Sequence, residues 1–313
     1  MSLDEASMLE VADEAEVPSE QIEKKRLGFG FWISVAWLAA IVLLALLAPI
    51  LPLKDPDKNF LQFEVTENAI TGRLTEQPIQ PPYSPSSEHW LGTDQDARDV
   101  LSRTIYGARV SLVVGFAAIA FGFLVGGTLG MIAGFVRGWF DKVISFIFLV
   151  LLSFPGLVLA ILITSLVDRS LLTISLTLGI LSIAPVGRLA RAQTLVFAER
   201  EFVMAATTIG AKRSRILVRE LLPNVAIPMA ALALLGMAVA IVAEGGLAFL
   251  GLSIEKGSTW GKLIRTYTST IADLEDSPWM AFTPIGFLFA TVVALNYAGD
   301  KLRDYFDVRE ITL

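Results

Sequence analysis

Six long stretches without a charged side chain constrain the fold of this chain more than any other feature. They cover residues 28–53, 110–136, 143–167, 170–187, 221–243 and 277–299. A helix of about 20 apolar residues crosses a hydrocarbon core of about 30 Å. Inside lipid every backbone polar group needs an internal partner, and a helix provides one. The sequence therefore predicts an all-α membrane protein with six transmembrane helices, of which the fourth, at 170–187, is the shortest.

The composition limits the chemistry that the chain can perform. Hydrophobic residues make up 54% of the 313 residues and charged residues 18%, and the net charge is -6. The sequence has no cysteine and a single histidine, His89, so thiolate chemistry and a histidine metal cluster are excluded. It also lacks a phosphate-binding glycine-lysine loop and any nucleophile–base pair. We therefore expect no catalytic residue, no bound metal and no nucleotide site in this chain.

The charged residues predict the orientation of the chain in a membrane. Lys24, Lys25 and Arg26 directly precede the first stretch, which places the acidic segment 1–27 in the cytoplasm. Six crossings then return residues 302–313, and also the polar segment 199–224, to the same side. Arg98, Arg103 and Arg109 would lie outside and count against this orientation. We expect Asp94–Arg98 and Asp99–Arg103 to pair there at helical i,i+4 spacing.

Residues 54–108 form the predicted extracytoplasmic segment. Alternation of apolar and polar residues at 61–66 predicts a strand, which can pair with residues 69–71. The end of the segment predicts an amphipathic helix at the membrane interface that leads into the second span. His89 is interpreted as a loop residue rather than a ligand.

The segment 199–224 is a charged island between two apolar stretches. Apolar residues at helical spacing predict a short helix at 201–209, and Gly210 supplies a turn in the left-handed backbone region. A second helix is predicted at 212–222, ended by Pro223. Such a pair on one membrane face is suited to docking another protein, although an ordinary amphipathic loop is the alternative.

Four motifs carry a resemblance to a known family. Ala205-Ala206, Gly210 and Leu222-Pro223 resemble the signature loop of binding-protein-dependent ABC importer permeases, although Met204 stands where that family usually has Glu. The others are similar to the dipeptide/oligopeptide branch; they lie at 89–112, with Ala97 in place of Gly, at 244–252, with Gly245 in place of Ala, and at 300–304.

The resemblance implies a type I ABC importer permease with a core at 109–301, in a bacterial cytoplasmic membrane. It implies a coupling helix that docks on a cytoplasmic ATPase, with Glu201 as a substitute for the missing acid. The residues assigned to this coupling are Glu201, Phe202, Met204, Ala205, Ala206, Gly210 and Pro223. The implied partners are a second permease subunit, two ATPase subunits that bind ATP and Mg, and an extracytoplasmic binding protein that delivers dipeptides or oligopeptides.

The outer mouth is assigned to Glu244, Gly245, Gly246 and Trp260. A carboxylate at the edge of an apolar stretch is costly unless it is paired or lines water. Glu244 could therefore attract the amino end of a peptide, or it could accept hydrogen bonds from backbone amides and hold a re-entrant loop in shape.

Glycines and prolines inside the spans have structural interpretations. Gly122, Gly126, Gly130 and Gly134 line one helix face and predict close packing, either within the subunit or against a second permease subunit. Pro155 and Pro185 are expected to kink the third and fourth spans.

Two alternative functions remain open. An ion-coupled secondary transporter would need ionisable residues near the middle of the membrane, and the six stretches contain none. An importer of the same type could instead carry nickel, glutathione or another small solute.

Overall fold

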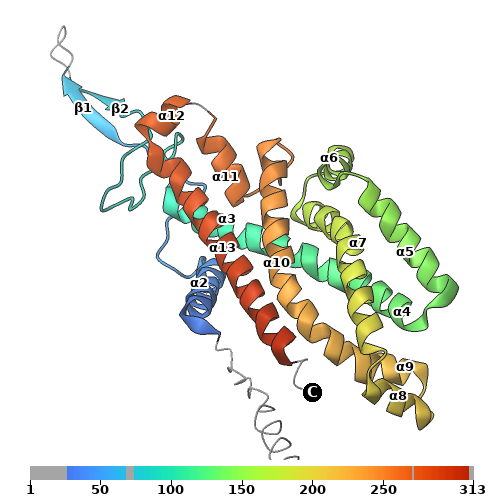
Figure 1. Cartoon of the computed structure of the whole chain (residues 1–313). Helices are drawn as coiled ribbons and strands as arrows, with labels where there is room; N and C mark the ends of the chain where they lie inside the picture. Colours follow the sequence, from blue (N-terminus) through green and yellow to red (C-terminus); the bar gives the residue numbers. More distant parts are fainter. Residues whose placement is uncertain (1–26, 68–73, 270, 310–313) are drawn as a thin grey trace, which may run out of the picture.

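The structure is a computed structural model that describes residues 27–67, 74–269 and 271–309, and it is mostly helical (Figure 1). The helices that carry the long apolar stretches are α2 (Gly28–Leu47), α3 (Val100–Gly122), α4 (Thr128–Val136), α5 (Gly138–Ser153), α6 (Gly156–Leu166), α7 (Leu171–Phe197), α10 (Leu222–Phe249) and α13 (Pro278–Arg309). The shorter ones are α8 (Glu201–Thr208), α9 (Arg213–Arg215), α11 (Trp260–Tyr267) and α12 (Ile271–Asp276). Two π-helical turns, Phe123–Gly127 and Ile216–Leu221, join α3 to α4 and α9 to α10.

Among the described residues, five continuous helical segments are long and apolar enough to cross a membrane, and α5 with α6 forms a sixth span only if the bent pair is counted as one. The two halves of that pair meet at an angle of 82°. Phe154 and Pro155 adopt extended backbone conformations at the break. Proline has no amide hydrogen and clashes with the preceding helical turn, so the predicted kink at Pro155 is a full break. Pro185, by contrast, lies inside the uninterrupted α7.

Several helices extend beyond the apolar stretches that predicted them. The helix predicted to begin at 110 begins at Val100, with no separate interfacial helix before it, and α7 continues from 187 to Phe197. Charged residues mark where a helix leaves lipid, but helical hydrogen bonds remain satisfied in water. The charged residues that bound each stretch therefore predicted the part of the helix that can lie in lipid and underestimated the length of the whole helix. In the opposite sense, α2 ends at Leu47, before the end of its stretch at 53.

The glycine stripe packs within the subunit. Helix α7 lies against α3, α4 and the π-helical turn between them. A Cβ atom added at Gly126 would overlap the carbonyl oxygen of Ile183, and one added at Gly130 would overlap that of Gly187. The two backbones approach this closely only because these positions carry no side chain. Of the two predicted explanations, the structure confirms packing within the subunit.

Helix α10 lies near the middle of the bundle, against α13, α3 and α7, and α2 packs on the outer side of α13 (Figure 1). One end of the molecule carries strands β1 (Phe63–Glu67) and β2 (Leu74–Pro78) with α11 and α12, and the other end carries α8 and α9. The strands pair antiparallel, Phe63 opposite Pro78. The predicted strand partner at 69–71 lies outside the described residues, and the segment that pairs with β1 is β2.

Candidate functional site

Helix α8 is a short helix between two spans at one end of the bundle. It begins after Arg200, whose backbone is extended, and it ends where Gly210 adopts a φ of +78°. The amides of Gly210 and Ala211 donate to the carbonyl oxygens of Thr207 and Ala206 and close the turn. A side chain at position 210 would be strained in this left-handed conformation. The structure thus confirms the predicted helix and the predicted glycine turn.

Helix α8 exposes an apolar surface. The exposed fractions are 36% for Phe202, 54% for Met204 and 84% for Ile209. Ala205 and Glu201 are also exposed, while Ala206 is half-buried. An apolar surface on a short helix at the polar end of a bundle is suited to contact with another protein. Because Met204 projects outward, an acid at this position would not be needed for folding.

Val203 fastens α8 to the rest of the molecule. It is 4% exposed and belongs to an apolar cluster with Phe197 of α7 and with residues of the helix that follows. Those residues are Ile216, Leu221, Val225 and Met229. The cluster joins the exposed helix α8 to the long helix α10, which is one of the apolar spans. Val203 was not predictable from the sequence, because one buried residue in an eight-residue helix leaves no periodic pattern.

The prediction that Pro223 ends the second short helix was wrong. Pro223 lies in the first turn of α10, directly after the π-helical turn Ile216–Leu221. The prediction treated the proline as the residue that ends a helix at 212–222. However, proline is well tolerated in a first helical turn, where its missing amide hydrogen costs little. The path from α9 into α10 is therefore nearly continuous helix.

At the opposite end of the molecule, Glu244 lies in the last turns of α10 and is 1% exposed. One of its carboxylate oxygens accepts hydrogen bonds from the hydroxyl groups of Ser253, at 2.7 Å, and Thr259, at 2.8 Å. The predicted re-entrant loop and its backbone-amide donors were wrong, because residues 244–249 are helical and side-chain hydroxyls are the donors. Glu244 thus holds the loop after α10 against the helix. Its burial does not favour contact with cargo.

Trp260 fixes α11 against α3. It is fully buried, its backbone amide donates to the Ser111 hydroxyl at 3.1 Å, and its indole nitrogen donates to the Thr104 carbonyl at 3.0 Å. The backbones of α10 and α11 also meet closely, since a Cβ atom at Gly261 would lie 2.5 Å from the Cα atom of Gly245. Gly246, the remaining residue assigned to the mouth, is half-buried, and a Cβ atom there would meet only the Leu157 side chain of α6, at 4.0 Å. Glu244, Gly245 and Trp260 therefore form a packed joint between α10 and α11, and Gly246 lies outside it.

A polar network secures the segment before α3. His89 is a buried loop residue whose Nδ1 atom lies 2.9 Å from an Asp99 carboxylate oxygen. Asp99 also accepts from the Ser102 amide and so caps α3. The predicted Asp94–Arg98 pair is present, whereas the predicted Asp99–Arg103 pair is not, because Arg103 contacts Asp94 at 3.5 Å.

Helix α11 adds two ionisable groups to this end. The Tyr267 hydroxyl donates to Asp94 at 3.3 Å, and burial raises the pKa of Tyr267 above its usual range. The Lys262 ammonium donates to the carbonyl oxygens of Ile254, Glu255 and Gly257. Burial, and then the nearby Arg103 guanidinium, lower the pKa of Lys262. Lys262 thus holds the loop after α10, whereas Tyr267 ties α11 to the segment before α3.

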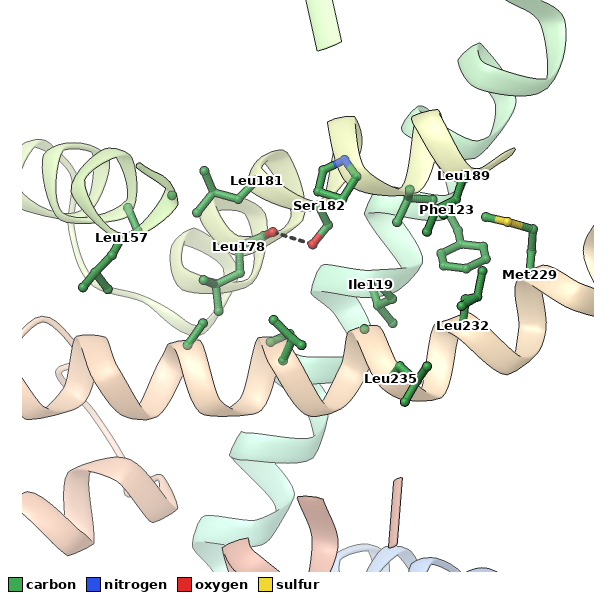
Figure 2. A pocket seen from close by; sticks show the side chains of 18 of the residues that line it. Ile119, Phe123, Leu157, Leu178, Leu181, Ser182, Leu189, Met229, Leu232 and Leu235 are labelled. Carbon is green, nitrogen blue, oxygen red and sulfur yellow. Dashed lines mark hydrogen bonds between the residues drawn. The ribbon is translucent and has the colours of Figure 1, made fainter. Parts of the chain in front are cut away.

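An apolar cavity of about 430 Å³ lies between α3, α6, α7 and α10 (Figure 2). Ile119 and Phe123 of one wall face Leu232 and Leu235 of α10 across it, and the Ser182 hydroxyl donates back to the Leu178 carbonyl at 2.8 Å. Ala243 and Leu247 also line it, whereas Glu244 and Trp260 do not. Within residues 27–67, 74–269 and 271–309, no group of three or more acidic or histidine side chains is placed to hold a metal ion.

Comparison with known proteins identifies the family. The model of the family described as binding-protein-dependent transport system inner membrane component matches residues 126–310, more than half of the chain. The chain belongs to this family. The matched residues include α7, α8 and α10, and therefore the apolar cluster that connects α8 to the spans. This permease is thus a multi-pass membrane protein.

Similar proteins and structures agree with this assignment. The dipeptide transport system permease protein DppC of Alkalihalophilus pseudofirmus is 34% identical over 92% of this chain and 88% of its own length. The oligopeptide transport system permease protein OppC of Bacillus subtilis is 34% identical over 71% and 72%. The glutathione transport system permease protein GsiD of Pectobacterium atrosepticum is 35% identical over 71% and 73%.

A solved structure shows the fold. A chain of the MetNI methionine ABC transporter, in an inward-facing conformation, matches with a TM-score of 0.54. It is 18% identical and covers 67% of this permease and 96% of that chain. The matched part of the permease therefore has the type I ABC importer fold.

Proposed function

We propose that this chain is a membrane-spanning subunit of an ATP-driven importer that carries dipeptides or oligopeptides. The observation that supports this most directly is α8, which exposes Phe202, Met204 and Ile209 while Val203 joins it to α10. A helix arranged in this way can receive movement from a partner and pass it to a span. The relatives named as dipeptide and oligopeptide permeases support the peptide cargo.

The proposed partners follow from what the chain lacks. It carries no nucleotide-binding loop, so two cytoplasmic ATPase subunits bind ATP and Mg, and one of them receives α8. A second permease subunit completes the translocation path, and an extracytoplasmic binding protein delivers the cargo to the end that carries α11. In this arrangement the chain termini and α8 lie in the cytoplasm, which agrees with the basic residues around α8 and before α2.

The mechanism requires the ATPase to treat two permease conformations differently. ATP closes the ATPase pair, α8 moves with it, and the cluster around Val203 carries the movement into α10. The bundle then opens toward the binding protein, and hydrolysis resets it. Equal contact of α8 with both ATPase states would shift no equilibrium, so the contacts must differ between them.

A second candidate keeps the transport cycle and changes the cargo. The relative from Pectobacterium atrosepticum is named for glutathione transport and is 35% identical to this chain, against 34% for the dipeptide permease from Alkalihalophilus pseudofirmus. Glutathione is itself a small peptide, so the proposed site chemistry is shared. Nickel or another small solute would differ more strongly from the proposed peptide cargo.

The test is ATPase activity in liposomes that contain this subunit, its co-purified partners and the binding protein. We expect peptide-loaded binding protein to stimulate hydrolysis, and Gly210→Val to remove the stimulation. The φ of +78° at Gly210 strains any other residue, by about 1 kcal/mol or more, while no atom lies within 4 Å of an added Cβ. The lesion is therefore confined to the turn after α8, and assembly should persist.

The matched control is Gly286→Ala, which also places a Cβ in open space but at an ordinary helical backbone position. We expect it to retain stimulated hydrolysis and uptake. Stimulation by glutathione or nickel instead of peptides would select the second candidate. Full peptide uptake by the Gly210→Val protein, or the absence of any co-purified ATPase, would refute the proposed coupling.

A further inference from the structure

Five cations around α8 form a group that we call the basic collar: Arg200, Lys212, Arg213, Arg215 and Arg219. All five side chains are exposed, and within residues 27–67, 74–269 and 271–309 none has an ion pair or a hydrogen bond. Two neighbouring arginines, by contrast, are paired with carboxylates. Arg191 of α7 donates to Asp141 of α5 at 2.7 Å, and Arg137 donates to Glu199 at 2.9 Å. The fold supplies carboxylates for those two arginines and leaves the collar without them.

The collar has a strong local excess of positive charge. Arg200 directly precedes α8, and the other four residues lie on or beside α9 and the π-helical turn that packs against α8. The acids on these same elements are Glu201 and Glu220, neither of which pairs with a collar residue. Unscreened charge of one sign on adjacent elements creates a field that attracts a flexible chain of the opposite sign.

The same chain carries a segment of matching charge. Residues 4–23 contain eight acids and no lysine or arginine. Helix α2, which follows this segment, begins toward the end of the molecule that carries α8 and α9 (Figure 1). The 26 residues before Leu27 can extend by about 3.3 Å each, so they can reach any point on that end of the bundle.

We infer that the acidic segment 4–23 binds the basic collar of its own subunit. Attachment to the same chain gives the segment an effective concentration in about the millimolar range, which favours it over a separate acidic protein. Eight acids against five cations also allow several pairs at once, which compensates for the small contribution of each exposed pair. The contact itself does not depend on the proposed transport function. Only its consequence does: an ATPase that docks on α8 must displace the segment or share the surface with it.

The absence of cysteine from the chain permits a direct test by cross-linking. The full-length chain would carry Ala15→Cys in the acidic segment and Ser214→Cys between two collar residues, in nanodiscs of neutral lipid. A bis-maleimide reagent would then join the two sites. We expect a high yield at low salt and about fivefold less at 1 M salt, where the screening length falls to about 3 Å.

Two controls make the result specific. Pairing Ala15→Cys with Ser87→Cys, an exposed position in the segment before α3, tests whether proximity at the collar is required. Replacing the eight acids by Asn and Gln, with both collar-site cysteines kept, should lower the yield about as much as high salt does. A yield that equals the Ser87 control, or that ignores these replacements, overturns the inference.

Anionic lipid is the other possible occupant of the collar. Labelling of Ser214→Cys by a soluble maleimide, in nanodiscs with and without phosphatidylglycerol, distinguishes it. Protection that follows the lipid and not the acidic segment would overturn the inference. None of these readouts needs ATP or cargo, so their failure would leave the proposed function intact, and a failed transport assay would leave this contact intact.

Discussion

A single carboxylate, Glu244, shows how a residue at the mouth of a transporter can be structural. One of its carboxylate oxygens accepts hydrogen bonds from the Ser253 and Thr259 hydroxyl groups. The Thr259 hydroxyl in turn accepts a hydrogen bond from the Lys262 amide and caps α11. The charge of Glu244 is not paired with a cation by any of these contacts. What the joint needs is an acceptor oxygen at this position.

Substitution of Glu244 separates the structural role from a charge-based one. Glu244→Gln keeps an acceptor oxygen of the same reach, so we expect uptake and melting temperature close to those of the parent. Glu244→Ala leaves two buried hydroxyls without their acceptor and should cost about 1–3 kcal/mol of stability. Thermal melting of the detergent-purified protein, with uptake in liposomes, checks both. Loss of uptake with unchanged melting in Glu244→Gln would instead support attraction of the peptide amino group.

At the scale of elements, the pair formed by α7 and the α3–α4 segment is set by backbone contact. Gly126 and Gly130 face the carbonyl oxygens of Ile183 and Gly187. Gly127 is adjacent in the chain but faces elsewhere, since a Cβ there would meet only the Val186 side chain, at 3.9 Å. Gly126 in the stripe and Gly127 beside it therefore differ strongly in their tolerance of a side chain.

Alanine substitutions at Gly126 and Gly127 test this difference in tolerance. Gly126→Ala must push α7 away or shift its backbone, and we expect a loss of about 1–3 kcal/mol or failure to fold. Gly127→Ala, the matched control, should stay within about 0.5 kcal/mol. Size-exclusion chromatography and melting after detergent extraction measure both. Equal behaviour of the two variants would contradict the close packing of α7 on this face.

Prolines show that the same residue type acts differently in different elements. Pro155 coincides with a bend of 82° between α5 and α6, Pro185 lies within continuous α7, and Pro223 occupies the first turn of α10. Their local chemistry is identical. The packing of each element decides whether a proline breaks, tolerates or begins a helix.

For the whole molecule, the decisive arrangement is the path from one end to the other. Helix α8 contacts α10 through the cluster around Val203, and α10 runs to Glu244 and the joint with α11 at the opposite end. One long helix thus connects the surface proposed for the ATPase with the end proposed for the binding protein. This connection gives a physical route for coupling.

Neighbouring substitutions on α8 test that route. Val203→Asp places a carboxylate in an apolar cluster and should release α8, with amide exchange in α8 at least about tenfold faster and peptide-stimulated ATPase activity lost. Met204→Glu changes a residue that is 54% exposed and should leave exchange unchanged. Hydrogen exchange by mass spectrometry and ATPase assays measure the two effects. Retained coupling in Val203→Asp would exclude this cluster as the route.

Much of the fold and part of the site were predictable from the sequence. Uncharged stretches longer than a bilayer is thick give the spans, because lipid cannot solvate charge or open backbone. Gly210 gives the turn after α8, because glycine enters the left-handed backbone region at little cost. The motifs at 199–224 and 244–252 gave the family, which the comparisons established.

Other features depend on contacts between residues far apart in the chain. The partner of Arg103 is Asp94 rather than Asp99, the carboxylate of Glu244 binds hydroxyl groups from beyond α10, and Val203 is the buried residue of α8. Local spacing cannot reveal these choices, because several partners satisfy it equally well and packing selects among them. The sequence by itself determined which segments are apolar enough to cross a membrane and that the charged segment 199–224 lies between two of them. Only the tertiary structure decided how that segment is joined to the spans.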